Sequence, residues 1–280
     1  MAVKEIEIKN IDQLNKVIWD QEYHDSIKRN RSNYLYRGIP NADFHLATSL
    51  QRNCGIKKND IETSILRNFT KYAAIEDPAL NSSVWRQLIV GQHHGLPTRL
   101  LDWTYSVLVA LHFATSGEDL GSMDKHDCIL WQIDILEMNR RLPLRYQNIL
   151  NGRNAFLMTV DMMDEATGDM MSAQKALKRY DEDMEDRAMV LLEPPSLDQR
   201  IISQYSYFSV IPSAIERGGD ALGIEAFLDH TDNTVKYIID AGLKWRIRDM
   251  LDQMNINERI VYPGLDGLTM WLKRHYYVKK

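Results

Sequence analysis

The segment Val107–Ala114 is the longest apolar stretch of the chain, and His112 alone interrupts it. Thr104 or Ser106 can cap a helix there that extends to Thr115. A helix that is apolar on nearly every side must be covered by protein on every side. The stretch is far shorter than the roughly 20 residues that a membrane-spanning helix needs. The chain of 280 residues therefore has to form a globular core around this helix, and it is long enough to do so.

Segments typical of strands and of helices are mixed along the chain without strict alternation. Pro97 indicates that Leu96–Trp103 is a compact turn. We find no internal repeat and no linker-like composition, and we expect one domain over residues 1–280. The expected fold class is α+β, with a helical N-terminal part packed on a mostly antiparallel sheet. Strands are predicted at Val3–Ile8, Tyr34–Arg37, Cys128–Ile135, Ala188–Leu192, Tyr207–Ile211 and Val235–Ile239, and helices beyond the central one include Ile61–Phe69, Gly223–Leu228, Leu243–Met254 and Leu268–His275.

The overall charge and the cysteine count exclude several classes of protein. Lys and Arg number 34 against 39 Asp and Glu, which gives a net charge of −5. This balance disfavours a strongly basic protein that binds nucleic acid without sequence preference. Cys54 and Cys128 lie far apart, so neither a disulfide framework nor a cysteine-based zinc site is expected. The charged, alternating N-terminus is not typical of a signal peptide, and we expect a cytoplasmic protein without a membrane partner.

The densest cluster of reactive side chains runs from Gln92 to Thr104. It brings together an amide, two imidazoles, a guanidinium, a carboxylate and an indole around Gly95 and Pro97. The simplest structural interpretation is that Asp102 pairs with Arg99 and that the neighbouring indole is part of the core. A functional interpretation is favoured, because polar groups crowded beside a buried helix are costly unless they are hydrogen-bonded or serve a site. We expect Asp102 to be largely buried, accepting hydrogen bonds from Arg99 or from backbone amides near Thr104.

Two shorter clusters contain further polar residues that fit a binding site. Tyr36-Arg37-Gly38 ends a predicted strand, where an arginine can present its planar fork to a phosphate and a glycine lets a ligand approach. The segment Arg200–Phe208 contains Gln204, whose amide can donate and accept near a ribose. Taken alone, the tripeptide does not exclude an ordinary surface or ion-paired arginine, and Gln204 alone is better explained as a solvated side chain at an edge.

Metal-binding and nucleotide-binding motifs of the common kinds are not found. His93 and His94 are adjacent, so on a helix they cannot face one ion together, and no His-Glu-x-x-His motif occurs. The sequence also contains no Gly-x-Gly-x-x-Gly, no Walker loop and no Gly-x-Ser-x-Gly elbow. We therefore expect no metal cofactor.

At these clusters the sequence resembles the FRG domain family of bacteria and phages. The family is named for an aromatic-Arg-Gly motif, which here is Tyr36-Arg37-Gly38. Its next element resembles Phe44–Arg52, and its most distinctive block resembles Gln92–Trp103 with the following Ala110–Ala114. The resemblance extends over about residues 3–272, and later elements of it are Arg200, Gln204 and Phe208, followed by Tyr262–Leu268. One departure is Ser206, where the family pattern implies a glycine.

An arginine-glycine pair at the end of an early strand is similar to the first motif of mono-ADP-ribosyltransferases. By that analogy Arg37 would hold the diphosphate of NAD⁺, and Gln204 or Glu193 would orient the nicotinamide ribose and stabilise its oxocarbenium character. Tyr36 or Trp103 would stack on a ring, and His93 would act as the base for an incoming protein or nucleic-acid acceptor. Such an enzyme fits a toxin or defence effector. No Ser-Thr-Ser strand and no Gln/Glu-x-Glu pair accompany the first motif.

Two other functions fit the same residues. One is a non-catalytic module that senses a nucleotide, another anionic small molecule or a protein. The other is a protein that acts on nucleic acid through Arg37, Arg52 and Arg99. A carboxylate beside the arginine, for which Asp102 and Glu193 are the candidates, would favour the enzyme. We predict a common cleft surrounded by residues from three distant segments: Arg37, His93, Thr98, Arg99, Asp102 and Gln204.

Overall fold

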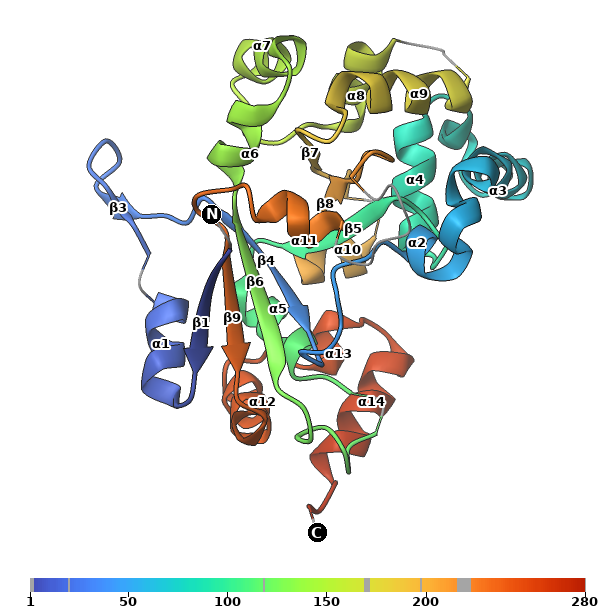
Figure 1. Ribbon diagram of the computed structural model, residues 1–280. Helices are drawn as coiled ribbons and strands as arrows, with labels where there is room; N and C mark the ends of the chain where they lie inside the picture. The colour runs from blue at the N-terminus through green and yellow to red at the C-terminus, as the bar shows by residue number, and fades with distance from the viewer. Residues whose placement is uncertain are drawn as a thin grey trace.

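The computed structural model describes residues 3–19, 21–117, 119–168, 172–196, 198–215 and 223–279. Within these residues one mixed sheet of seven strands forms the centre of the molecule, in the order β1-β9-β6-β4-β5-β8-β7. All neighbouring strands are antiparallel except β1 and β9. The predicted α+β class with a mostly antiparallel sheet is confirmed (Figure 1). The strands are β1 Lys4–Ile8, β4 Tyr34–Ile39, β5 Leu100–Thr104, β6 Cys128–Asp134, β7 Val190–Leu192, β8 Ser206–Val210 and β9 Val235–Ile239.

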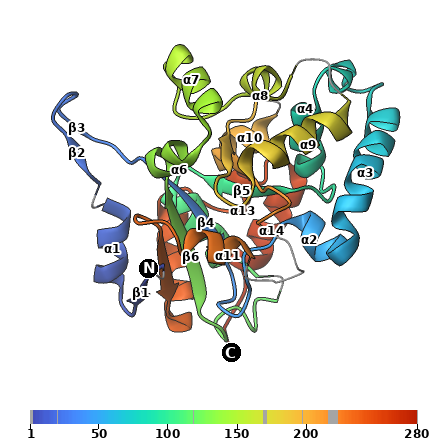
Figure 2. The ribbon, with the colours of Figure 1, turned by 45° about the horizontal axis from the view of Figure 1, so that its top comes forward.

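Helices cover both faces of the sheet and one of its ends. On one face, α1 Ile11–Trp19, α5 Val107–Ala114 and α12 Lys244–Gln253 share an apolar cluster with β4, β6 and β9. On the opposite face, α11 Gly223–Leu228 packs beside Trp103 and Trp131. Figure 2 shows α3, α4, α8 and α9 gathered around the β5-β8-β7 end. The remaining helices are α2 Ser49–Cys54, α3 Lys58–Ala73, α4 Val84–His93, α6 Ile135–Arg141, α7 Leu144–Arg153, α8 Val160–Thr167, α9 Ala173–Met184, α10 Gln199–Gln204, α13 Glu258–Val261 and α14 Leu265–His275.

The apolar helix α5 lies directly against strand β4, and Gly38 makes this contact possible. A Cβ atom at Gly38 would lie 1.9 Å from the carbonyl oxygen of Ala110 and 2.4 Å from the backbone nitrogen of Ala114. Ser106 caps the helix by accepting from the amide of Val109 at 3.3 Å. The prediction that this helix is buried is confirmed. The glycine is therefore required by the packing of α5 on β4, and its role in the approach of a ligand stays a prediction.

The prediction of a compact turn at Leu96–Trp103 is wrong in its second half. Leu100–Thr104 is strand β5, which pairs with β8 from Leu100 opposite Val210 to Thr104 opposite Ser206. The pairing partner lies far along the chain, so the local sequence gave no indication of it. The expected strands at the other positions are confirmed to within a few residues. Among the described residues, no helix is long and apolar enough to cross a membrane.

Candidate functional site

A pocket of about 320 Å³ opens where strands β4 and β5 meet helix α10. Arg37 lies on β4, Asp102 lies on the neighbouring strand β5, and Gln204 ends α10 just before β8. The predicted convergence of these three distant segments is therefore confirmed for these three residues. We call this the Arg37 pocket; its lining consists of Tyr36, Arg37, Gly38, Pro40, Gln92, Asp102, Trp103, Thr104, Phe113, Ser116, Arg200, Gln204 and Ser206.

Arg37 is anchored by one nitrogen and leaves another without a partner. Its Nη1 donates to the carbonyl oxygen of Asp102 at 2.6 Å and lies 3.6 Å from the carboxylate of the same residue. Its Nε is buried and has no hydrogen-bond partner among the described residues. Burial lowers the pKa of Arg37, and nearby Arg52 acts in the same direction while Asp102 opposes it. The guanidinium remains charged, and its unsatisfied N–H can serve a ligand.

Asp102 is exposed, contrary to the expectation that it is buried. Its side chain retains 53% of its accessible surface. The reason is the alternation of strand β5, which turns Leu101 and Trp103 into the core and Asp102 away from it. Its partners also differ from the expected ones, since Gln92 Nε2 donates to Asp102 Oδ2 at 2.9 Å and Arg99 does not contact it. The pocket thus holds an accessible carboxylate beside a guanidinium.

Gln92 is held in a fixed orientation by two hydroxyl groups. Thr98 Oγ1 donates to Gln92 Oε1 at 2.6 Å, and Ser49 Oγ donates to the same oxygen at 3.3 Å. An amide oxygen that accepts twice forces the amide nitrogen to the opposite side, toward Asp102. Thr98 therefore acts behind the pocket. Sequence reasoning included Gln92 in the central cluster without singling it out.

The third side of the pocket consists of Arg200 and Gln204 on one face of α10. Gln204 Nε2 donates to the carbonyl oxygen of Val261 at 3.1 Å, which ties this side to α13. The guanidinium of Arg200 lies over the ring of Tyr262, with its central carbon 5.3 Å from the ring centre. Sequence reasoning named Arg200 as an element of the family resemblance but not as a site residue. Its position four residues before Gln204 places both side chains on one helical face, and this spacing was the available signal.

Besides Thr98, three expected site residues do not line the pocket. His93 pairs with Asp198, and burial lowers the pKa of His93. Arg99 is buried in ion pairs with Glu62 at 2.5 Å and Asp181 at 2.7 Å, on the side of α3 and α9. Glu193 follows β7 and is exposed. Among the described residues that line the Arg37 pocket, none of the three is found.

The two aromatic residues proposed to stack on a ligand are mostly committed to the core. Trp103 is only 3% exposed, and its Nε1 donates to Ser209 Oγ at 3.0 Å. Tyr36 is also buried, and its hydroxyl lies 3.4 Å from that of Ser32. Both contribute to the wall of the pocket, but neither presents an open ring face for stacking.

Residues 32–122 match the model of the FRG domain. This range includes Arg37, Gln92 and Asp102 together with helix α5. The chain contains an FRG domain. No curated protein and no solved structure matches it. The segments with Arg200, Gln204 and Tyr262 lie outside the matched range, and a single FRG domain over residues 1–280 stays a prediction.

A second pocket, of about 570 Å³, adjoins the first beneath the FRG helix α5. It shares Pro40 and Ser116 with the Arg37 pocket, and we call it the Tyr262 pocket. Its lining consists of Pro40, Asn41, Phe44, His112, Ser116, Gly117, Asp119, Leu120, Ser122, Met123, His126, Lys244, Arg248, Glu258, Tyr262, Met270 and Arg274.

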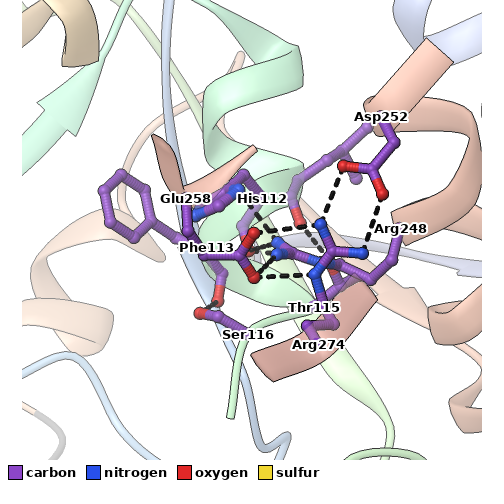
Figure 3. Close-up of polar contacts among 9 residues, drawn as sticks. His112, Phe113, Thr115, Ser116, Arg248, Asp252, Glu258 and Arg274 are labelled. Atoms are coloured by element: carbon purple, nitrogen blue, oxygen red, sulfur yellow. Dashed lines mark hydrogen bonds and ion pairs between the residues drawn. The ribbon is translucent and has the colours of Figure 1, made fainter. Parts of the chain in front are cut away.

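A buried charge network joins the FRG helix α5 to the C-terminal helices at the floor of this pocket. Glu258 lies between Arg248 and Arg274, and Arg274 also pairs with Asp252 (Figure 3). Arg248 Nη1 lies 2.9 Å from Nδ1 of His112. Burial and the adjacent Arg248 lower the pKa of His112 to about 3, so this histidine is neutral. Burial favours the neutral acid of Glu258, but hydrogen bonds from Arg274 and the charge of Arg248 hold its pKa at about 2.

Among the described residues, no group of three or more His, Cys, Asp and Glu side chains is arranged to hold a metal ion. The chemistry available in the Arg37 pocket is that of two guanidinium groups, two amides and one accessible carboxylate.

Proposed function

We propose that the Arg37 pocket binds the diphosphate of a nucleotide and that this FRG-domain protein is an NAD⁺-dependent enzyme similar to ADP-ribosyltransferases. One observation carries the proposal. The carboxylate of Asp102 is accessible in the same pocket as the guanidinium groups of Arg37 and Arg200. A site that only binds an anion gains nothing from a carboxylate, because like charges repel. A site that stabilises developing positive charge on a sugar needs one.

The residues present fit the anionic part of such a ligand. Arg37 has a buried Nε–H without a partner, and Arg200 lines the same pocket. Guanidinium groups bind phosphate oxygens through parallel hydrogen bonds. The pocket volume of about 320 Å³ is at the lower end of the range for ligand sites, about 300 to 1,000 Å³. The pocket would therefore enclose part of a dinucleotide and leave the rest outside.

NAD⁺ supplies an ADP-ribosyl group together with a good leaving group, nicotinamide. Asp102 would lie against the ribose and stabilise the positive charge that develops there. Gln92 would keep that carboxylate in place through its 2.9 Å hydrogen bond. Gln204 would bind a ribose hydroxyl with its side-chain oxygen, since its nitrogen donates to Val261. The bacterial defence or toxin setting and a macromolecular acceptor are parts of this same proposal.

The alternative is a module that binds a nucleotide without turnover. It is favoured by the position of His93, the expected base, which pairs with Asp198 outside the pocket. The hypothesis that the protein acts on nucleic acid is less well supported. Arg99, one of its three arginines, is paired with Glu62 and Asp181 and is not available to phosphates.

The decisive experiment measures nicotinamide release and NAD⁺ affinity on the same purified samples. Asp102→Asn should abolish release while the affinity stays within about tenfold, because the carboxylate acts on the transition state. Arg37→Lys keeps the charge but loses the fork and should weaken binding. Asp25→Asn, an exposed aspartate far from the pocket, is the matched control and should change neither quantity.

The assay is repeated with cell extract, which supplies acceptors. If a folded protein does not bind NAD⁺ at millimolar concentration, the proposal is wrong. Binding that depends on Arg37, with no release in any sample, supports the binding module instead.

A further inference from the structure

We propose that the Tyr262 pocket holds the adenine base of the dinucleotide whose diphosphate lies in the Arg37 pocket. This inference rests on the proposed function and extends it to a second subsite. Four features of the structure support it: the continuity of the two pockets, the apolar wall of the second one, the pairing of its charges and the position of Asp102.

The two pockets are continuous. Pro40 and Ser116 line both of them. Phe113 lines the Arg37 pocket and Tyr262 lines the other, and their rings meet edge to face with centres 6.2 Å apart. Arg200 lies over the same Tyr262 ring from the side of the first pocket. A ligand too large for about 320 Å³ can therefore extend into the adjoining 570 Å³.

The wall of the Tyr262 pocket brings together exposed large apolar side chains from two distant segments. Phe44 is 56% exposed and Met270 is 47% exposed, and they come from opposite ends of the chain. Both nevertheless line this one pocket, together with Met123 and Leu120. Aromatic and thioether side chains of this kind pack well against a flat ring. The burial of Phe44 and Met270 by a ligand would remove apolar surface from water.

The charged groups at the floor of this pocket are already paired. Arg274 is satisfied by Glu258 and Asp252, and Arg248 donates to Glu258 and to His112. Nε of Arg248 and Nε2 of His112 are buried without a partner among the described residues, which leaves single N–H or nitrogen groups of the kind that a purine ring can bind. The positive charges of both arginines are balanced by protein carboxylates, which disfavours the binding of a phosphate there. The pocket therefore suits a neutral aromatic ring better than a second anion.

Lys244 is the remaining cation of the lining, and it is also engaged. Its Nζ donates to the backbone carbonyl oxygens of Pro40 at 2.7 Å and Met123 at 3.0 Å. These two bonds anchor α12 beneath the pocket wall. They favour a structural role for Lys244 over the capture of an anion.

The position of Asp102 decides which end of the dinucleotide enters the second pocket. Asp102 lies in the Arg37 pocket, so the ribose on which the carboxylate acts belongs there, with nicotinamide attached. The diphosphate at Arg37 and Arg200 then directs the other nucleoside toward Tyr262. That nucleoside carries adenine.

The test compares ligands that share one end of the dinucleotide, using calorimetry on the folded protein. ADP-ribose and AMP contain the adenine, whereas nicotinamide mononucleotide contains only the other half. Phe44→Ala should lower the affinity for ADP-ribose and AMP by about tenfold, as expected for the loss of a base-stacking partner. The affinity for nicotinamide mononucleotide should not change. Met270→Ala should also lower the affinity for ADP-ribose and AMP alone, by a smaller factor. Phe156→Ala, at an exposed phenylalanine that lines neither pocket, is the control.

Each result has a definite meaning, given circular dichroism spectra that match the unchanged protein. If ADP-ribose binds in an Arg37-dependent manner and neither Phe44→Ala nor Met270→Ala changes its affinity, the subsite is wrong while the proposed function stands. Equal losses for ADP-ribose and nicotinamide mononucleotide also overturn the adenine assignment. If none of the three ligands binds at millimolar concentration, the proposed function and the subsite fail together.

Discussion

The side-chain amide of Gln92 donates to the carboxylate of Asp102 at 2.9 Å, across the gap between helix α4 and strand β5. The amide is held in this orientation because its oxygen accepts from Thr98 at 2.6 Å and has the Ser49 hydroxyl 3.3 Å away. One carboxylate oxygen is thus fixed by the protein. The carboxylate as a whole stays accessible to the pocket, so it is positioned without being neutralised.

The role of Gln92 is testable through kinetics. Gln92→Leu should lower nicotinamide release by about tenfold or more and leave NAD⁺ affinity nearly unchanged, since it frees Asp102 without touching the arginines. Gln92→Glu should be at least as damaging, because it sets a second carboxylate beside the first. Gln253→Leu, an exposed glutamine on α12, is the control. Normal turnover in Gln92→Leu would show that Asp102 needs no such support.

Alanine substitutions at Asp102 and Arg99 should lower the free energy of unfolding by very different amounts. Asp102→Ala should lower the free energy of unfolding by about 1 kcal/mol or less, because an exposed ion pair contributes little. Arg99→Ala should lower it by about 3 kcal/mol or more, because it leaves the buried carboxylate of Glu62 without its partner. Urea unfolding followed by circular dichroism measures both. A large loss for Asp102→Ala together with a small one for Arg99→Ala would reverse our assignment of the two residues.

The sequence predicted the sheet well because hydrophobic patterns mark buried strands. Cys128–Asp134 is buried along its whole length, as a central strand must be. Strand β5 escaped prediction because Leu100–Thr104 follows Pro97 closely and is defined by its pairing with distant β8. The helices α6, α7 and α8 were also missed. Many polar residues interrupt the apolar pattern between residues 135 and 167. The structure of this region therefore depends on its tertiary contacts more than on local sequence.

The candidate site was predictable in outline and not in its contacts. Arg37, Asp102 and Gln204 belong to the three polar clusters that the sequence analysis singled out, and the structure brings them together. Whether a polar residue faces the pocket or the core depends on the register of its strand or helix. Arg99 and Asp102 are three residues apart, yet one is buried between helices and the other opens to the pocket. That difference could not be read from composition or spacing.

The buried network around His112 should make folding sensitive to acid. The pKa of His112 is lowered from 6.5 to about 3 in the folded protein, so the unfolded chain binds a proton more readily between these values. Stability is therefore full above about pH 6.5 and falls as the pH decreases toward 3, by about 1.4 kcal/mol per pH unit from this residue. Glu258, whose pKa is lowered to about 2, adds to the loss below its ordinary value of 4.5.

The measurement that isolates His112 is the slope of unfolding free energy against pH. His112→Gln can still accept a hydrogen bond from Arg248 and does not titrate. Between pH 6 and 5, where Glu258 is mostly ionised in both states, the slope for His112→Gln should be smaller than that of the unchanged protein by about 1.2 kcal/mol per pH unit. Parallel slopes in this range would mean that His112 is protonated in the folded protein.

Gly38 should tolerate no side chain, because helix α5 packs on its α-carbon. In Gly38→Ala the new Cβ would lie 1.9 Å from the carbonyl oxygen of Ala110, and backbone atoms cannot yield as a flexible side chain can. Separating α5 from β4 would disturb both pockets, since Phe113 and Ser116 follow on the same segment. We expect the free energy of unfolding to fall by about 3 kcal/mol or more, or the protein not to fold.

Gly152→Ala in α7, with nothing within 4 Å of the new Cβ, is the matched control for Gly38→Ala and should be neutral or stabilising by up to about 1 kcal/mol. Both variants are compared by urea unfolding, and a Gly38→Ala protein as stable as the unchanged one would show that α5 does not lie against β4 as described.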